Sequence, residues 1–272
     1  MESKQVVGLE EGWEQIKTKG IDVLVAIIEN GNAEDTAHQI TPHQLMPIYE
    51  VCYDMCAQKA PYNWSAQLYA RHGETIEIYL REKALPALQN QHGESLLNEL
   101  QRRWQNHNFM IKWMSKFFMI LNRYYVKHNS LPSLANAGLN AFKTVVFSVI
   151  KKDFADAILA SVDKERGGEI VDTTLLRNCT EVFVAMGMGS LEAYESDLEG
   201  PFIKRAVSSY NSTEMQAWMD GGSTSPEYIS KVDEILKIEA SRVACYMHAT
   251  TEAKLLRALR MELIVNHQTV LL

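Results

Sequence analysis

The stretch WQNHNFMIKWMSKFFMILNRYYV, residues 104–126, decides the fold class of this chain. Aromatic and methionine side chains run along its whole length, and it contains neither glycine nor proline. Six of its apolar residues recur at spacings of three and four, which places them on one side of an α-helix. They are Met110, Trp113, Met114, Phe117, Phe118 and Leu121. A stripe this wide predicts a helix that is buried in a helical core.

A second face of the same helix combines basic side chains with one isoleucine. It contains Lys112, Lys116, Ile120, Arg123 and Lys127. Two interpretations are open. This face is either the solvated side of a core helix, which periodicity alone favours, or a surface that meets a partner.

The composition is typical of a helical globular protein. The 272 residues suffice for one large domain or two of ordinary size, and 46% of them are hydrophobic. A formal charge of -7 gives no general attraction to nucleic acid or to anionic lipid. No stretch approaches the roughly 20 apolar residues of a membrane span, and the N-terminus has no apolar signal core. We therefore expect a soluble intracellular protein without nucleic-acid or membrane partners.

The four cysteines are expected to be reduced thiols, because they are too few and too scattered for a disulfide framework. They are Cys52, Cys56, Cys179 and Cys245. Cys52 and Cys56 lie four residues apart and could share a metal, but no second pair is near them in the sequence. Buried or partner-facing thiols are the favoured interpretation.

The sequence predicts no catalytic residue, no metal site and no cofactor. The 8 histidines show neither HxxxH nor HExxH spacing, and there is no P-loop, GxGxxG or GxSxG motif. Glu192, Glu195 and Glu199 have a spacing that could suit carboxylate ligands, but no histidine partners accompany them. A solvated acidic face is the favoured interpretation.

Segments of helical period follow one another without convincing strand alternation, which predicts an all-α solenoid or bundle. Asp172-Thr173 and Ser225-Pro226-Glu227 have the composition of helix starts. Gly200-Pro201 and Gly221-Gly222 are poor interior helix sequence, so we expect loops or kinks there. Trp218, beside the second of these breaks, is expected in the core.

The segment QLMPIYEVCYDMCAQ, residues 44–58, predicts one amphipathic helix. Its apolar face carries Leu45, Ile48, Tyr49, Cys52, Tyr53 and Cys56. Pro47 is tolerable only if the helix starts near Gln44. Packing into the protein's own core is the simplest interpretation of this face. Two tyrosines nevertheless suit a protein interface, because they combine a large contact area with a polar tip.

Several segments, in their order and spacing, resemble the N-terminal region of a cullin of the plant cullin-1-like type. They are LEEGWEQI (9–16), YDMCAQKAPYNWSAQLY (53–69), RWQNHNFMIKWMSKFFMILNRYYV (103–126), SLPSL (130–134), KERGGEIVDTTLLRNCTEVFVAMGMG (164–189), YESDLEG (194–200) and RVACYMHATTEAKLL (242–256). The resemblance covers essentially the whole chain. It implies a cullin-repeat solenoid of stacked five-helix bundles, with a first repeat at 1–135 and a second at 136–272.

The resemblance also implies a function. Cullins are non-catalytic scaffolds of cullin-RING ubiquitin ligases, and their first repeat grips a SKP-type adaptor that carries an F-box protein. The chain stops before the family's third repeat and its C-terminal RING-binding domain, so no RING subunit is expected as a partner. The implied location is the cytoplasm and nucleus.

In the family, the second and fifth helices of the first repeat hold the adaptor. The matching positions here are Leu45, Met46, Ile48, Tyr49, Cys52, Tyr53, Ile120 and Arg123. Pro47 and Ile120 depart from the family pattern, which commonly has a helix former and a tyrosine there. The alternative is therefore a truncated cullin-like protein that has lost adaptor binding or competes with full-length cullin for adaptors. Adaptor binding requires Tyr49 and Tyr53 to be exposed beside Ile120.

Overall fold

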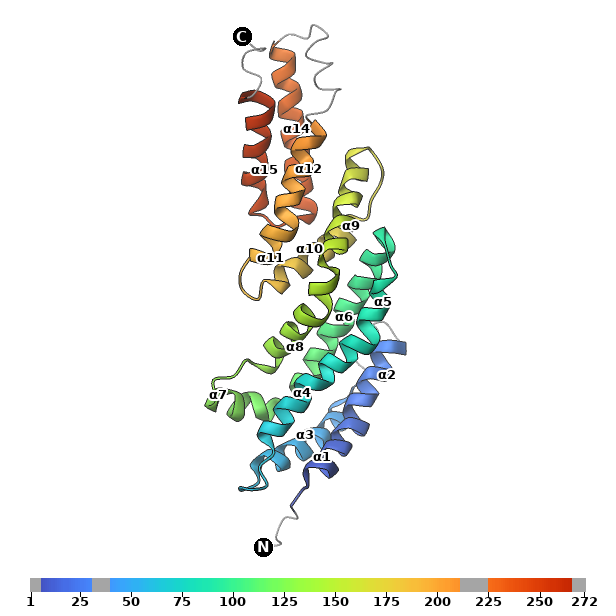
Figure 1. Ribbon diagram of the computed structural model, residues 1–272, viewed down its shortest axis with the longest axis vertical. Helices are drawn as coiled ribbons and strands as arrows, with labels where there is room; N and C mark the ends of the chain where they lie inside the picture. Colours follow the sequence, from blue (N-terminus) through green and yellow to red (C-terminus); the bar gives the residue numbers. More distant parts are fainter. Residues whose placement is uncertain (1–5, 31–39, 211–224, 266–272) are drawn as a thin grey trace. The chain divides into compact units, whose positions relative to one another are not determined.

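The computed structural model describes residues 6–30, 40–210 and 225–265 (Figure 1). All secondary structure in these ranges is helical, which confirms the predicted all-α solenoid class. The chain divides into two compact units, residues 1–91 with 99–150, and residues 92–98 with 151–272. The repeat boundaries inferred from the resemblance stay a prediction, because compactness does not define a repeat.

The first unit is built from long helices that contain π-helical turns. α1 (Leu9–Ile16) continues through η1 (Lys17–Ile21) into α2 (Asp22–Asn30), and α3 (Pro42–Ala57) follows. α4 (Ser65–Tyr79), η2 (Leu80–Ala84) and α5 (Leu85–Gln89) form the next continuous helix. α6 (Gly93–Phe117) leads to η3 (Leu121–Tyr125) and α7 (Val126–His128), and α8 (Leu134–Phe142) leads to η4 (Lys143–Phe147).

The apolar stripe of α6 forms the core of this unit, as predicted. Met110, Met114, Phe117 and Phe118 are 0% exposed. Burial of such side chains stabilises the fold by about 1.5 to 3 kcal/mol each. The stripe therefore accounts for a large share of the unit's stability.

The prediction that Ile120 lies on the open basic face is wrong, because Ile120 is 6% exposed. The backbone leaves the α-helical pattern at this point. The Leu121 amide donates to the Phe118 carbonyl at 2.9 Å, and the π-helical turn η3 follows. Ile120 follows Trp113 by seven residues and Phe117 by three, so helical spacing places it at the boundary between the apolar stripe and the basic face, where the core covers it.

α3 starts earlier than predicted, at Pro42 and not near Gln44. Thr41 and Gln44 form a capping box, in which the Thr41 amide donates to Gln44 Oε1 at 2.9 Å and the Thr41 side chain accepts from the Gln44 amide. Pro47 consequently lies inside the helix. It has no amide proton for the usual hydrogen bond to the carbonyl of His43, a defect that costs about 3 kcal/mol in an ordinary helix interior.

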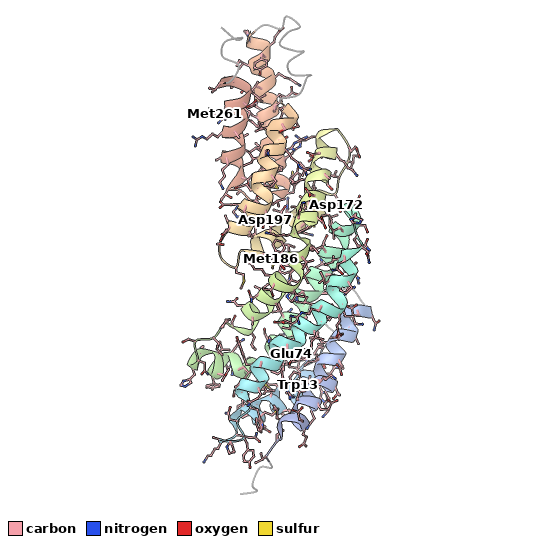
Figure 2. All side chains as sticks on the ribbon, in the orientation of Figure 1. Trp13, Glu74, Asp172, Met186, Asp197 and Met261 are labelled. Carbon is pink, nitrogen blue, oxygen red and sulfur yellow. The ribbon has the colours of Figure 1, made fainter. Side chains whose placement is uncertain are left out.

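The second unit contains most of α9 (Ser148–Arg166), then α10 (Thr173–Met186), α11 (Glu192–Tyr194), η5 (Glu195–Glu199), α12 (Gly200–Tyr210), α14 (Ser225–Tyr246), α15 (Thr251–Arg260) and η6 (Met261–Val265). The predicted starts of α10 and α14 are confirmed. Asp172, labelled in Figure 2, accepts a hydrogen bond from the Leu175 amide at 2.9 Å.

Gly200-Pro201 does not form a loop, because the helix passes from the π-helical turn η5 directly into α12. Trp218 and Gly221-Gly222 lie outside the described residues. The prediction of a solvated acidic face is wrong for Glu199, which is 3% exposed. Thr251 and Lys254 donate to its carboxylate at 2.7 and 2.6 Å, so hydrogen bonds replace the lost water.

A buried ion-pair network joins the helices of the second unit. Glu239 is 0% exposed, and Arg166 donates to both of its carboxylate oxygens at 3.0 Å. Arg242 and Tyr210 donate to the same carboxylate at 2.6 and 2.9 Å. Although burial opposes it, this set of donors holds the pKa of Glu239 below its usual value. Glu239 is thus an ionised group on which α9, α12 and α14 converge.

Candidate functional site

A groove of about 730 Å³ opens on the first unit between the end of α3, the start of α4 and the η3–α7 segment. Residues far apart in the sequence line it: Tyr53, Cys56, Ala57, Asn63, Ser65, Ile120, Arg123, Tyr124, Tyr125, Lys127, His128 and Asn129. Three of the predicted partner-binding residues, Tyr53, Ile120 and Arg123, therefore meet in one concave surface. We call it the α3–η3 groove.

The predicted partner-binding residues of α3 divide between its two faces. Tyr53 is 45% exposed and Met46 is 50% exposed, while Leu45 and Tyr49 are half-buried. The rings of Tyr49 and Tyr53 lie 6.3 Å apart. The structure thus presents the two tyrosines on one side of α3, although Tyr49 only partly.

Ile48 and Cys52 lie on the opposite, buried face of α3, with exposed fractions of 3% and 0%. This face packs against α1 and η1, where Gly20 lets the helices approach closely. A Cβ atom at Gly20 would lie 3.0 Å from Ile48 Cδ1. Ile48 and Cys52 therefore support the tyrosines from beneath and do not offer contact area to a partner in this conformation.

Hydrogen bonds from the loop between α3 and α4 hold the α3 side of the groove in place. The Trp64 amide donates to the Met55 carbonyl at 3.0 Å, and Gln58 Nε2 donates to the Tyr62 carbonyl at 2.7 Å. Asn63 donates to the Cys56 carbonyl and accepts from the Ser65 amide. These bonds fix the end of α3 against the start of α4, so this wall is formed before any partner binds.

The η3–α7 wall is also held from within the unit. Asn122 Oδ1 accepts from the Leu134 amide at 3.0 Å, and the Tyr69 hydroxyl donates to the Pro132 carbonyl at 2.9 Å. The ring of Tyr69 lies 5.9 Å from that of Tyr125. Sequence analysis missed Tyr124 and Tyr125 as groove residues, since they follow the change of helical pattern, whereas Lys127 could be anticipated four residues after Arg123.

A hydrogen bond joins the two cysteines of α3. A hydrogen bond to Cys56, together with burial, raises the pKa of the Cys52 thiol, and the same bond lowers the pKa of Cys56. Among the described residues, no group of three or more histidine, cysteine or acidic side chains could hold a metal ion. The polarizable sulfur of Cys56 lines part of the groove.

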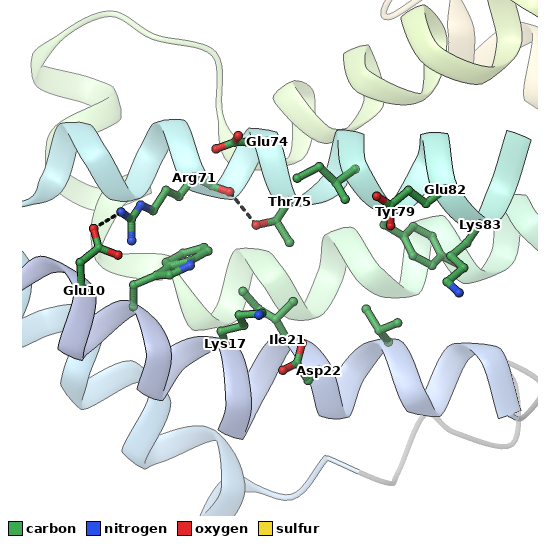
Figure 3. A pocket seen from close by; sticks show the side chains of 13 residues that line it. Glu10, Lys17, Ile21, Asp22, Arg71, Glu74, Thr75, Tyr79, Glu82 and Lys83 are labelled. Atoms are coloured by element: carbon green, nitrogen blue, oxygen red, sulfur yellow. Dashed lines mark hydrogen bonds and ion pairs between the residues drawn. The ribbon is translucent and has the colours of Figure 1, made fainter.

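A second groove of about 590 Å³ lies between the α1–η1–α2 helix and α4 (Figure 3). Arg71 pairs with Glu10 at one end, and its guanidinium carbon lies 5.3 Å from the centre of the Trp13 ring. Figure 2 labels Trp13 and Glu74, which come from the two sides. Acidic and basic side chains both line this groove, and none of the predicted site residues does.

Comparison with known families identifies the family of the chain. The model of the cullin alpha solenoid domain matches residues 15–272. The chain belongs to the cullin family. Its resemblance to cullins, inferred from the sequence segments, is thereby confirmed.

Individual cullins and cullin-like proteins are similar to this chain over nearly its whole length. Cullin-1 of Oryza sativa subsp. japonica is 38% identical over 99% of this chain and 35% of its own length. Cullin-2 of Arabidopsis thaliana is 37% identical over 94% of the chain and 34% of its own length. Cullin-like protein 3 of Arabidopsis thaliana is 35% identical over 92% of this chain and 93% of its own length. The chain thus spans about a third of the length of the two cullins.

Within residues 6–30, 40–210 and 225–265, no helix is long and apolar enough to cross a membrane. The predicted lack of enzymatic activity remains a prediction. The groove has aromatic side chains on its two walls and cationic side chains at one end.

Proposed function

We propose that this chain acts as a scaffold segment of a cullin-RING ubiquitin ligase and binds a SKP-type adaptor, and through it an F-box protein, at the α3–η3 groove. The observation that carries the proposal is the meeting of Tyr53 and Arg123 in one groove. These residues match the adaptor-gripping helices of the family, which are separated in the sequence. Family membership supports the scaffold role.

We infer different roles for the predicted contact residues from their exposed fractions. Met46, Tyr53 and the open edge of Tyr49 supply the area that an adaptor would cover, and Arg123 supplies a charged rim. Large aromatic side chains of this kind often dominate the binding energy of an interface. Ile48 and Cys52 would act indirectly, since they hold those side chains in position from the core, whereas Ile120 would contribute only a small exposed area to the groove.

A second candidate function is competition for adaptors. Cullin-like protein 3, of which the chain covers 93%, is a relative of similar length, whereas Cullin-1 is about three times longer. A short polypeptide that carries the groove without a RING-binding domain would occupy adaptors without assembling a ligase. This candidate uses the same groove and differs only in the outcome of binding.

Calorimetric titration of the chain with a SKP-type adaptor bound to an F-box segment tests the proposal. Tyr53→Ala should weaken binding by about 2 kcal/mol, roughly a thirtyfold rise in Kd. Tyr62→Ala is a matched control, because Tyr62 is 48% exposed against 45% for Tyr53 but does not line the groove. Equal affinities for the two variants, or no binding by the folded wild-type chain, would refute the proposal.

The two candidate functions separate in a competition assay. Addition of this chain to a ligase assembled on a full-length cullin should slow substrate ubiquitination if the chain sequesters adaptors. The Tyr53→Ala variant should compete less well than Tyr62→Ala. Ubiquitination that is unaffected by an excess of the adaptor-binding wild-type chain would eliminate the competitor role.

A further inference from the structure

One end of the α3–η3 groove carries positive charge without a compensating carboxylate. Arg123 and Lys127 lie about one helical turn apart on η3 and α7, with His128 beside them. No aspartate or glutamate lines the groove. This local charge contrasts with the chain as a whole, whose formal charge is -7.

Many other basic groups of the chain have acidic partners. Arg71 pairs with Glu10, Arg81 with Glu77 at 2.9 Å, and Lys151 with Asp197 at 3.1 Å; Lys254 pairs with Glu195 and Glu199. In the part of the chain that the structure describes, neither Arg123 nor Lys127 forms an ion pair. Both side chains are exposed. Their charge is therefore available to a partner.

The rest of the groove excludes a purely ionic site. Tyr53, Tyr124 and Tyr125 present aromatic surface, and Tyr124 is 67% exposed. Ile120 closes the floor with little exposed area. A ligand that fills the groove must therefore offer apolar side chains to its middle and negative charge to its η3–α7 end.

We propose that the α3–η3 groove selects a protein segment that packs an apolar or aromatic side chain against Tyr53 and places carboxylates against Arg123 and Lys127. This inference rests on the proposed function of the groove and adds the chemistry of the segment that it accepts. The planar guanidinium of Arg123 suits a carboxylate, with which it can form two parallel hydrogen bonds.

The charge distribution predicts how such a partner finds the groove. The formal charge of -7 opposes the approach of an acidic protein, whereas Arg123 and Lys127 attract it locally at the groove. Charge complementarity of this kind raises the association rate and fixes orientation more than it adds affinity. The net negative charge of the chain disfavours a long polyanion such as nucleic acid, and the aromatic lining favours apolar side chains, so a short acidic protein segment fits better.

The test measures association and dissociation rates of the adaptor–F-box complex for the wild-type chain and two double variants. Arg123→Gln/Lys127→Gln neutralises the groove. Lys152→Gln/Lys237→Gln is the matched control, since it removes the same charge from two exposed lysines that do not line the groove. At about 50 mM salt, the groove variant should associate about tenfold more slowly than the control, and about 500 mM salt should remove most of this difference.

Equal association rates and equal salt dependence of the two double variants would overturn this inference. They would leave the proposed function intact if Tyr53→Ala still accelerated dissociation. No binding by the wild-type chain would overturn both. A single-stranded oligonucleotide that binds the chain with salt-sensitive affinity, and is lost in the groove variant alone, would also overturn the inference, because it would assign the groove to nucleic acid.

Discussion

Replacement of His72 by leucine tests how the core of the first unit responds to pH. His72 is 1% exposed, and its ring meets that of Phe118 edge-on with 5.4 Å between their centres. Neither ring nitrogen has a hydrogen-bond partner among the described residues. Burial lowers the pKa of His72 from 6.5 to about 4, so the fold favours the neutral imidazole.

The direction of this shift fixes the sign of the effect. The unfolded chain binds the proton more readily than the folded one, so the stability associated with neutral His72 is present above pH 6.5 and is lost as the pH falls towards 4. The loss between pH 7 and pH 5 is about 2 kcal/mol per histidine, and about 3 kcal/mol below both pKa values. His107, which is 0% exposed and also has a pKa of about 4, contributes a similar loss.

The assay is urea unfolding, followed by circular dichroism, between pH 7 and pH 5. Over this range the free energy of unfolding attributable to the two histidines should fall by about 4 kcal/mol in the wild-type chain and by about 2 kcal/mol in His72→Leu. At pH 7 the variant should be at least as stable, because leucine buries no unpaired nitrogen. His43→Leu is the control, since His43 is exposed. An identical pH slope in wild type and His72→Leu would refute the reasoning.

Two further substitutions test the cores of the separate units. Phe117→Ala should lower the free energy of unfolding by about 3 to 5 kcal/mol, since the ring is 0% exposed. If this variant unfolded in urea at the same midpoint as the wild type, the assignment of the α6 stripe to the core would be contradicted. Glu239→Gln should destabilise by a similar 3 to 5 kcal/mol because the charge of Arg166 is left without its buried carboxylate. The exposed Glu234→Gln serves as the thermal-unfolding control, and equal melting temperatures of the two glutamine variants would show that the network adds no stability.

Much of the fold could be predicted because regular periodicity and capping chemistry act locally. The α6 stripe from Met110 to Phe118 is buried as its spacing indicates. The aspartate before α10 caps that helix as predicted. The candidate site could be located only through the resemblance, since no local rule connects Tyr53 with Arg123 across the intervening helices.

The remaining differences arise where a local pattern meets a tertiary constraint. Ile120 was assigned to the basic face, but it lies where that face borders the apolar stripe and is buried with the stripe. Pro47 lies inside α3 since the capping box at Thr41 starts the helix one half-turn earlier than expected. Glu199 is buried because Thr251 and Lys254, some fifty residues later, supply its hydrogen bonds. Only the partners of Glu199 are distant in the sequence, whereas the capping box of α3 is formed by neighbouring residues and could have been recognised from Thr41 and Gln44.

The two faces of α3 connect the groove to the core. Tyr53 is exposed on one face, while Ile48 on the other meets Gly20, where an added Cβ atom would lie within 3.0 Å. A larger residue at position 20 would displace α3 and misalign the tyrosine without altering any groove residue. A cullin-like protein could thus lose adaptor binding while keeping its tyrosines. Glycine at position 20 preserves the close packing here, and the α3–α4 loop fixes the end of the helix, which supports the proposal that the groove binds an adaptor.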